Sequence, residues 1–372
     1  MSVNAQVLSA GAALAVLKEA WRAQEADKLT ASWMLHGRPG VGKSQIVQQL
    51  ADSIGARLFD LRLTTIEPQD LRGLPYYDHA ARKTVWYRPE DLPDDPETPA
   101  ILFLDELTAA SPYLQPTVYG LLQERRVGQH QLPKNVMILA AGNTVEDGAI
   151  AYEMGTALSD RLIHLHLQPN ARDWLENYAA PKGLHPAVTA FLRARPDLLD
   201  TTEDALRNGQ MIACTPRAWE KTSTILNAVF DWPARTAMIY GTLGDAVGAE
   251  FLSVAEEVET AVHIPELLQA SYKERIALFP DSMNALNAIV FGLVGTADGD
   301  TAKKVIEVME QIRHLDTERE TEVFAQFPLA ELSAFGFEVL MQKALRDGFA
   351  NAFAQSDAYR RYAADRQTLG LE

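Results

Sequence analysis

The sequence predicts an α/β fold for the first half of the chain, a parallel sheet between helices, followed by an all-helical second half. Short apolar runs alternate with helical periodicity from residue 31 to about 168, the order expected of a parallel sheet covered on both faces. After Pro169 the strand-like runs stop, and apolar residues recur at i, i+3 and i+4, the spacing of amphipathic helices.

Five strands are expected in the first half, at Trp33–His36, Leu58–Leu63, Ala100–Leu104, Val136–Ala141 and Leu162–Leu167. The third run is apolar at successive positions, as is typical of a strand buried on both faces. We expect an amphipathic helix, ending at about Gln24, before the first strand.

Two further segments of the first half carry local signals. Ser111 followed by Pro112 is an N-cap with Pro at the first helical position, which predicts a helix that starts there and runs to Arg125. In Gly73–Pro89, two aromatic-rich halves flank a polar middle, which predicts a projecting β-hairpin.

The second half is predicted to hold eight helical segments, near 171–180, 185–194, 216–230, 234–262, 265–278, 282–296, 301–314 and 329–354. Asp231-Trp232-Pro233 interrupts the pattern. We therefore predict three domains, namely an α/β core at 1–169 that includes the hairpin at 73–89, a small helical domain at 170–230 and a second helical domain at 231–372.

Composition narrows the class of protein. The net charge of −16 matches a nucleic-acid backbone poorly, and no long Lys/Arg run occurs. The single cysteine, Cys214, excludes an intrachain disulfide, fits a reducing compartment and is expected to be a small buried apolar residue.

Two apolar stretches have no targeting or membrane character. Val7–Leu17 follows no Lys or Arg, so it is not a signal peptide, and Met283–Ala297 is too short to span a bilayer. We expect a cytoplasmic protein with no membrane or nucleic-acid partner.

The stretch from Gly37 to Ser44 fits the Walker A phosphate loop, two glycines four residues apart followed by Lys and Ser. It follows a predicted strand and opens a predicted helix, which is the context that the motif requires. Its backbone N–H groups would hold phosphate oxygens, Lys43 would supply a positive charge, and the Ser44 hydroxyl would bind Mg²⁺. The residues expected around the nucleotide are Gly37, Pro39, Gly40, Val41, Gly42, Lys43, Ser44, Gln45 and Asp105.

Three polar residues follow two other predicted strands. Asp105 and Glu106 end an apolar run, and Asn143 comes just after another. Ligands of parallel sheets bind at the carboxyl ends of the strands. We therefore expect Asp105 to hold Mg²⁺ with Ser44, Glu106 to polarise the attacking water, and Asn143 to contact that water or the γ-phosphate.

Two arginines are weaker candidates, because a surface arginine is usually just solvated. Arg161, before the last strand, could reach the γ-phosphate of a neighbouring copy if the chain forms rings. Arg217, near the start of a predicted helix, could reach the nucleotide of its own subunit.

The order GRPGVGKS, ILFLDE, AAGN, LSDR and TPRA resembles that of AAA+ ATPases. Two stretches, at 67–73 and 121–127, resemble the MoxR branch in particular. The resemblance covers roughly residues 30–230.

The resemblance implies an αβα core, a helical lid at 170–230, Mg²⁺-dependent ATP hydrolysis, and active sites between subunits of a ring, expected to be a hexamer. It assigns catalytic roles to Lys43, Glu106, Asn143, Arg161 as arginine finger and Arg217 as sensor 2. The hairpin would project toward the ring pore. MoxR relatives act as chaperones that remodel or activate partner proteins, often with a von Willebrand factor A domain partner.

The chain departs from this family in places. The region at 231–372 is longer than the usual lid and has no assigned role, and the hairpin between Val127 and Asn135 would be small. Arg125 and Arg126 are expected to be a solvated helix end rather than residues acting in trans. The aromatic residues of the projecting hairpin are expected to pack across strands rather than to grip a client.

Other functions stay open. A nucleic-acid motor or loader would use the same core, but it would need a basic pore lining or a helix-turn-helix, neither of which is visible. A scaffold that binds ATP to assemble, with little turnover, is a further alternative, against which Glu106 argues. A small-molecule kinase would leave Arg161 without a role.

Overall fold

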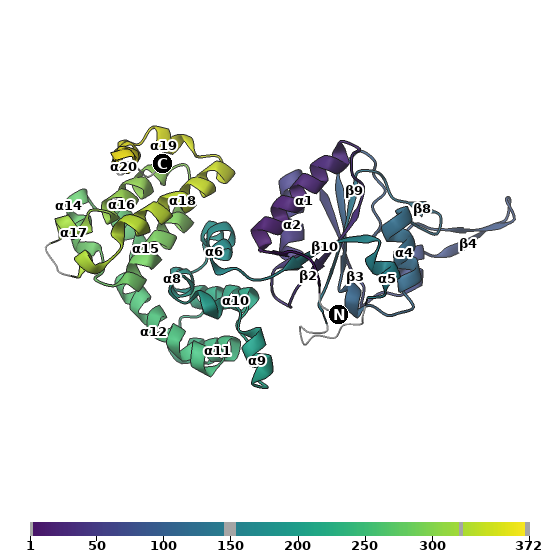
Figure 1. Cartoon of the computed structure of the whole chain (residues 1–372), viewed down its shortest axis with the longest axis horizontal. Helices are drawn as coiled ribbons and strands as arrows, with labels where there is room; N and C mark the ends of the chain where they lie inside the picture. The colour runs from purple at the N-terminus through teal and green to yellow at the C-terminus, as the bar shows by residue number, and fades with distance from the viewer. Residues whose placement is uncertain (1–2, 145–153, 320–322, 369–372) are drawn as a thin grey trace. The chain divides into compact units, whose positions relative to one another are not determined.

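The computed structural model describes residues 3–144, 154–319 and 323–368 (Figure 1). The chain divides into two compact units, Met1–Asn170 and Ala171–Glu372. Each unit has its own hydrophobic interior and is described by itself. The domain limits inferred from the sequence, including the one at residue 231, stay predictions.

The first unit is built on a six-stranded sheet in the order β1-β10-β2-β9-β6-β3, and every neighbouring pair is parallel. The strands are β1 Val7–Leu8, β2 Ser32–His36, β3 Arg57–Arg62, β6 Ala100–Asp105, β9 Val136–Gly142 and β10 Leu162–Leu167. The five predicted strands are confirmed. The short edge strand β1 was not predicted.

Helices cover both faces of this sheet. They are α1 Ala10–Glu25, α2 Lys43–Ile54, α3 Pro68–Arg72, α4 Gln115–Glu124 and α5 Thr156–Ser159, with a 3₁₀ turn at Leu107–Ala109. Strand β6 shows how the layers form. Ile101 and Phe103 pack with α1 and α2, whereas Leu102 and Leu104 pack with α4, because successive side chains of a strand point to opposite faces. The predicted αβα sandwich is confirmed.

The start of α4 differs from the prediction. Ser111 and Pro112 do not open the helix, which begins at Gln115. The segment before it is a turn closed by a 2.9 Å hydrogen bond from the Leu114 N–H to the Ser111 carbonyl. A turn also favours Ser and Pro at its first two positions, so the local signal was ambiguous and the helix starts three residues after Pro112.

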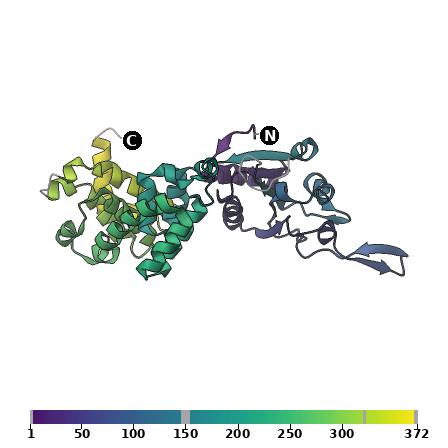
Figure 2. The same ribbon diagram turned by 90° about the horizontal axis from the view of Figure 1, so that it is seen from below.

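The predicted hairpin is confirmed as β4 (Pro75–Asp78) paired with β5 (Lys83–Trp86), and it projects from the body of the first unit (Figures 1 and 2). Gly73 starts it with a φ of 84°, and a Cβ there would lie 1.8 Å from the Tyr87 carbonyl oxygen. Only glycine fits such a close approach. The small hairpin expected between Val127 and Asn135 is also present, as the two-residue strands β7 (Arg126–Val127) and β8 (His130–Gln131).

The second unit consists of helices. They are α6 Ala171–Trp174, a π-helical turn Leu175–Ala179, α7 Ala180–Lys182, α8 Pro186–Ala194, a 3₁₀ turn Pro196–Leu199, α9 Thr202–Arg207, α10 Pro216–Ala228, α11 Trp232–Leu243, α12 Asp245–Ala261, α13 Ile264–Gln269, α14 Tyr272–Leu278, α15 Met283–Thr296, α16 Ala302–Ile312, α17 Leu315–Glu318, a 3₁₀ turn Phe324–Gln326, α18 Leu329–Asp347, α19 Asn351–Ala354 and α20 Asp357–Thr368.

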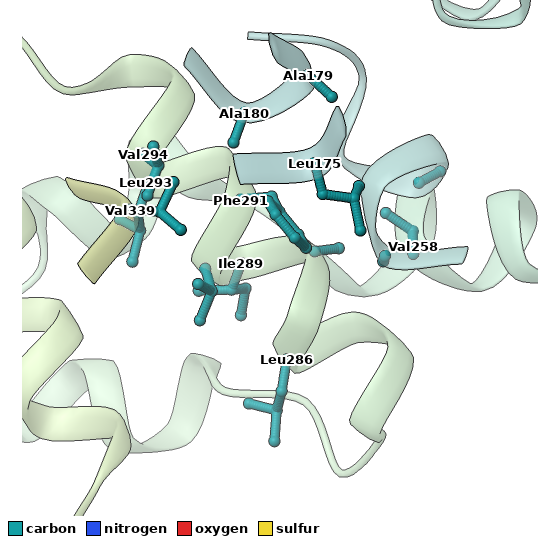
Figure 3. Close-up of a cluster of buried hydrophobic side chains, with 14 of the residues drawn as sticks. Leu175, Ala179, Ala180, Val258, Leu286, Ile289, Phe291, Leu293, Val294 and Val339 are labelled. Atoms are coloured by element: carbon teal, nitrogen blue, oxygen red, sulfur yellow. The ribbon is translucent and has the colours of Figure 1, made fainter. Parts of the chain in front are cut away.

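Helix α15 is the centre of this unit, because every residue from 285 to 294 is buried. It packs against α8, α12 and α18 among others. Figure 3 shows Leu286, Ile289, Phe291, Leu293 and Val294 of this helix with Leu175 and Val339 from other segments. One hydrophobic cluster contains residues from both sides of residue 231. The apolar run at Met283–Ala297 is therefore a core helix.

The helix predicted at 234–262 is two helices. Gly244, with a φ of 82°, separates α11 from α12, since a residue in that conformation cannot continue a helix. No helix among the described residues is long and apolar enough to cross a membrane. Cys214 is buried, as expected, and its burial raises the pKa of the thiol to about 11.

Candidate nucleotide-binding site

The phosphate-loop sequence forms the connection between β2 and α2. Gly42 precedes α2 with a φ of 104°, a conformation that side chains other than glycine's rarely adopt. Because Lys43 and Ser44 form the first turn of α2, their backbone N–H groups have no partner within the helix. A helix start of this kind attracts anions.

Lys43 is held by several acceptors around the loop. Its Nζ donates to the Gly37 carbonyl, to the Arg38 carbonyl at 3.1 Å and to Oδ1 of Asn143 at 2.8 Å. Asn143 follows β9, which pairs directly with β2. The two residues are 100 positions apart in the sequence, and the sheet topology brings them together.

Ser44 and Asp105 form an oxygen pair beside the loop. The Ser44 hydroxyl lies 3.4 Å from Oδ2 of Asp105, and Asp105 is 8% exposed at the end of β6. Hydroxyl and carboxylate oxygens are the ligands that Mg²⁺ prefers, so these two residues fit a magnesium ion held together with a phosphate. The Asp105 carboxylate also accepts the Glu106 backbone N–H at 2.9 Å.

Glu106 is held through its side chain by Arg62, the last residue of β3, and by Thr64 just after it. Its φ of 59° is unusual for a residue other than glycine. Its carboxylate accepts a hydrogen bond from the Thr64 hydroxyl and lies 3.8 Å from Nε of Arg62. Thr64 and Arg62 therefore restrain the Glu106 carboxylate. To bind a water molecule, this carboxylate would need an oxygen that is free of such contacts.

The other residues predicted around the nucleotide all lie on the loop or the first turn of α2. Val41 is buried among the side chains of α1 and α2 and anchors the loop. Pro39, Ser44 and Gln45 are exposed. Gly37 and Gly40 have positive φ values.

Arg161 contacts α4 and α5. Its Nε donates to Oε1 of Gln123 at 2.6 Å, its guanidinium also donates to the Ala157 carbonyl, and it lies over the ring of Tyr119 at 5.2 Å. These partners hold the arginine on the side of the sheet that α4 covers. Its role at a neighbouring subunit stays a prediction.

Arg217 is the second residue of α10 in the second unit and is exposed. The hydroxyl of Thr215 caps this helix by accepting the Ala218 N–H at 3.1 Å. The role of Arg217 as a sensor of nucleotide also stays a prediction.

The expectation that Arg125 is a solvated helix end is wrong. Arg125 ends α4 with a φ of 55°, and its guanidinium donates to the carbonyls of Pro133 and Val136. Burial lowers the pKa of this guanidinium. Arg125 thus fixes the loop before β9, whereas its neighbour Arg126 is exposed.

Sequence reasoning missed two residues of the site, Thr64 and Arg62. Arg62 ends β3 and pairs with Asp105 at the end of β6, and Thr64 follows two residues later. That position in a parallel sheet was the available signal. Asp60 lies on the same strand, and burial together with the negative charge of Asp105 raises the pKa of its carboxyl.

The fold and these contacts define a P-loop nucleotide-binding unit. Residues 32–162 match the family profile described as "AAA domain (dynein-related subfamily)", a match over about a third of the chain. This segment contains the phosphate loop, the two acidic residues Asp105 and Glu106 at the end of β6, and Asn143. It is therefore similar to AAA domains. No curated protein matches the chain.

Several solved structures are similar at low identity. The Holliday junction branch migration motor RuvB of Thermotoga maritima is 14% identical, with 67% of this chain and 68% of that chain covered and a TM-score of 0.35. A putative ATPase from Cytophaga hutchinsonii is 14% identical, with 90% and 88% covered and a TM-score of 0.33. Similarity at this level is no basis for a function.

Proposed function

We propose that this chain is a Mg²⁺-dependent ATPase of the MoxR type that works as a ring. The observation that carries the proposal is the convergence of Lys43, Ser44, Asp105 and Asn143, from two strand ends and one helix start, on the phosphate loop. The match of residues 32–162 to an AAA domain supports it.

The reaction is in-line attack of water on the γ-phosphorus of ATP, which forms one P–O bond and breaks the bond to the β-phosphate oxygen. The ammonium of Lys43 and the amide of Asn143 stabilise charge on the transferred group. Glu106 orients the water and accepts its proton. Ser44 and Asp105 hold Mg²⁺, which neutralises phosphate charge when it is bound.

The site is completed by a second copy of the chain. Arg161 from the neighbouring subunit supplies a guanidinium to the γ-phosphate, as expected of an arginine finger. Arg217 reports nucleotide state from the helical unit of the same subunit. We propose six subunits in the ring.

The ring acts on a protein client in the cytoplasm, as a chaperone that remodels or activates it. The projecting hairpin supports this role. Tyr87 stacks on Tyr76 across the hairpin at 4.4 Å between ring centroids, the packing expected from the sequence, yet Tyr77 and Tyr87 remain 55% and 61% exposed. Stacked rings on a projecting element offer a rigid apolar contact surface. A protein with a von Willebrand factor A domain is the proposed partner.

Phosphate release by the parent protein and by Glu106→Gln tests the enzymatic part. We expect the parent to hydrolyse ATP, and Glu106→Gln to bind ATP with similar affinity and lose at least 100-fold in turnover. Equal low rates in both proteins would contradict the proposal and favour an assembly scaffold. Glu106→Gln loaded with ATP is also the form with which the client should be isolated.

A further inference from the structure

We propose that His36 and His164 link the phosphate loop of one subunit to the turn that carries its Arg161, so that this pair positions the arginine presented to the next subunit. The inference rests on the function proposed above, in particular on the role of Arg161 in trans. It adds two positioning residues that no motif of the sequence singles out.

The first end of the link is the phosphate loop. His36 is the last residue of β2 and directly precedes Gly37, whose carbonyl accepts the Lys43 ammonium. The ring of His36 contacts that of His164 on the neighbouring strand β10, with 2.7 Å between Nε2 of His36 and Nδ1 of His164. The rings are nearly parallel, at 19°.

The second end is the turn before β10. Nε2 of His164 lies 2.9 Å from the carbonyl oxygen and 3.0 Å from the hydroxyl of Ser159. Ser159 ends α5, two residues before Arg161. The other end of the same turn binds the arginine itself, since the Arg161 guanidinium donates to the Ala157 carbonyl.

The positions of the protons determine which ring donates and which accepts in each hydrogen bond of this link. A carbonyl can only accept, so Nε2 of His164 must carry a proton and donate to Ser159. In the neutral ring Nδ1 then accepts, and His36 must donate through its Nε2. Both histidines are thus fixed in rotation and tautomer. A change in the position of His36 requires His164, and with it Ser159, to follow or to lose a partly buried hydrogen bond.

Nucleotide binding acts on the phosphate loop, the first end of the link, through Lys43. Its ammonium has three protons, and Gly37, Arg38 and Asn143 all accept from it. A phosphate oxygen can therefore bind the ammonium only in exchange for one of them. Exchange of the Gly37 carbonyl releases the Gly37–Arg38 peptide, one residue beyond His36.

A purely structural histidine pair would have a different effect. It would stabilise its own unit, and its loss would lower the stability of the subunit that carries the change. The proposed link acts instead on hydrolysis in the neighbouring subunit, because Arg161 works there. The two interpretations are separated by placing the substitution and the active site in different subunits.

The test uses mixed rings of two full-length variants. Arg161→Ala subunits keep an intact site but supply no arginine, whereas Glu106→Gln subunits cannot hydrolyse but supply one. Mixing them should restore phosphate release at the Arg161→Ala sites. We then add His164→Phe to the Glu106→Gln subunit. Phe keeps a ring of similar size and removes both polar atoms.

We expect His164→Phe in the donor subunit to abolish the restored activity, to within twofold of Arg161→Ala alone. His166→Phe in the same subunit is the control, since it changes the same residue type on the same strand outside the pair, and it should leave the restoration intact. His164→Gln can donate to Ser159 through its amide nitrogen but has no acceptor atom at the position of Nδ1, which faces His36. It should give the same loss and serves if the Phe variant does not fold. Melting temperature and assembly are measured for every donor.

Two results would overturn the inference. Full restoration by the His164→Phe and His164→Gln donors would refute the link and leave the trans role of Arg161 standing. If the Glu106→Gln donor restores nothing, the trans role itself fails and the link falls with it. The first result concerns only the histidines, whereas the second concerns the proposed function.

Discussion

The ammonium of Lys43 donates to the side-chain oxygen of Asn143 at 2.8 Å, which joins the helix start after β2 to the end of β9. The two side chains that we propose to act at the γ-phosphate are therefore already oriented by each other. Because both groups must rearrange when a phosphate binds, a change at either one alters nucleotide binding.

Asn143→Asp tests this relationship. A carboxylate would pair with the Lys43 ammonium and repel the triphosphate, so we expect nucleotide affinity to fall about tenfold or more, equivalent to about 1.4 kcal/mol. Asn143→Ala adds no charge and should reduce turnover about 100-fold with a smaller effect on binding. Titration with a fluorescent ATP analogue measures the affinities. Asn208→Asp, at the exposed end of α9, is the control, and equal affinities of Asn143→Asp and this control would refute the argument.

Thr64→Val should raise basal ATP turnover several-fold. Val has the shape of Thr but cannot donate the hydrogen bond that restrains the Glu106 carboxylate, so the carboxylate is released to bind water. Thr65→Val is the matched control, because the Thr65 hydroxyl donates instead to the Arg62 carbonyl at 2.9 Å. Steady-state phosphate release distinguishes the two variants. A fall in rate with Thr64→Val would mean that Thr64 orients Glu106 productively.

The interior of the second unit should be sensitive to truncation at Phe251. This side chain is fully buried and packs against Phe191 and Trp219, each at 5.4 Å between centroids. Phe251→Ala should cost about 3–5 kcal/mol in the free energy of unfolding, measured by urea titration. Phe230→Ala changes the same residue type at a site that is 84% exposed, and it should cost less than about 0.5 kcal/mol. Similar losses in both variants would contradict the packing described.

His185 should make the second unit less stable in mild acid. Burial, and to a lesser extent the charge of Arg235, lowers the pKa of this imidazole to about 4. Its Nδ1 caps α8 by accepting the Ala187 N–H at 3.2 Å, which a protonated nitrogen cannot do. The folded state thus favours the neutral ring. The associated stability is present above the unfolded pKa near 6.5 and is lost as the pH falls from there toward 4.

Over that interval we expect a loss of up to about 3 kcal/mol. His185→Asn keeps a capping oxygen without a titrating group, so its unfolding free energy should depend less on pH between 7 and 4.5. Urea titrations at several pH values measure the difference between the two proteins. Parallel pH profiles would show that His185 is not responsible.

The sequence predicted the elements whose signals are local. Ile101 to Leu104 are apolar in succession, and this alone identified a strand buried on both faces. The phosphate loop and Asp105 could be placed because a parallel sheet puts its strand ends at one edge. The predicted start of α4 was wrong because Ser111 and Pro112 suit a turn as well as a helix.

Other features depend on residues distant in the sequence. Strand β1 has two residues, too few for an apolar pattern, and it exists because Val7 pairs with His166. The restraint of Glu106 by Thr64 spans 42 positions, and the pairing of His36 with His164 spans 128. Nothing near these residues indicates their partners. The expectation for Arg125 was wrong for the same reason, since its acceptors are the carbonyl of Pro133 in the loop after β8 and that of Val136 at the start of β9.

The pairing of Val7 with His166 and of Leu8 with Leu167 has a consequence for synthesis. Of the six strands, β1 is synthesised first and β10 last. Because β1 adjoins only β10 in the sheet, it cannot pair until β10 has been made. A ribosome must therefore release the chain as far as Leu167 before this edge can close. Until then the nascent chain presents β2 without its β10 neighbour, an unpaired strand edge of the kind that chaperones protect during translation.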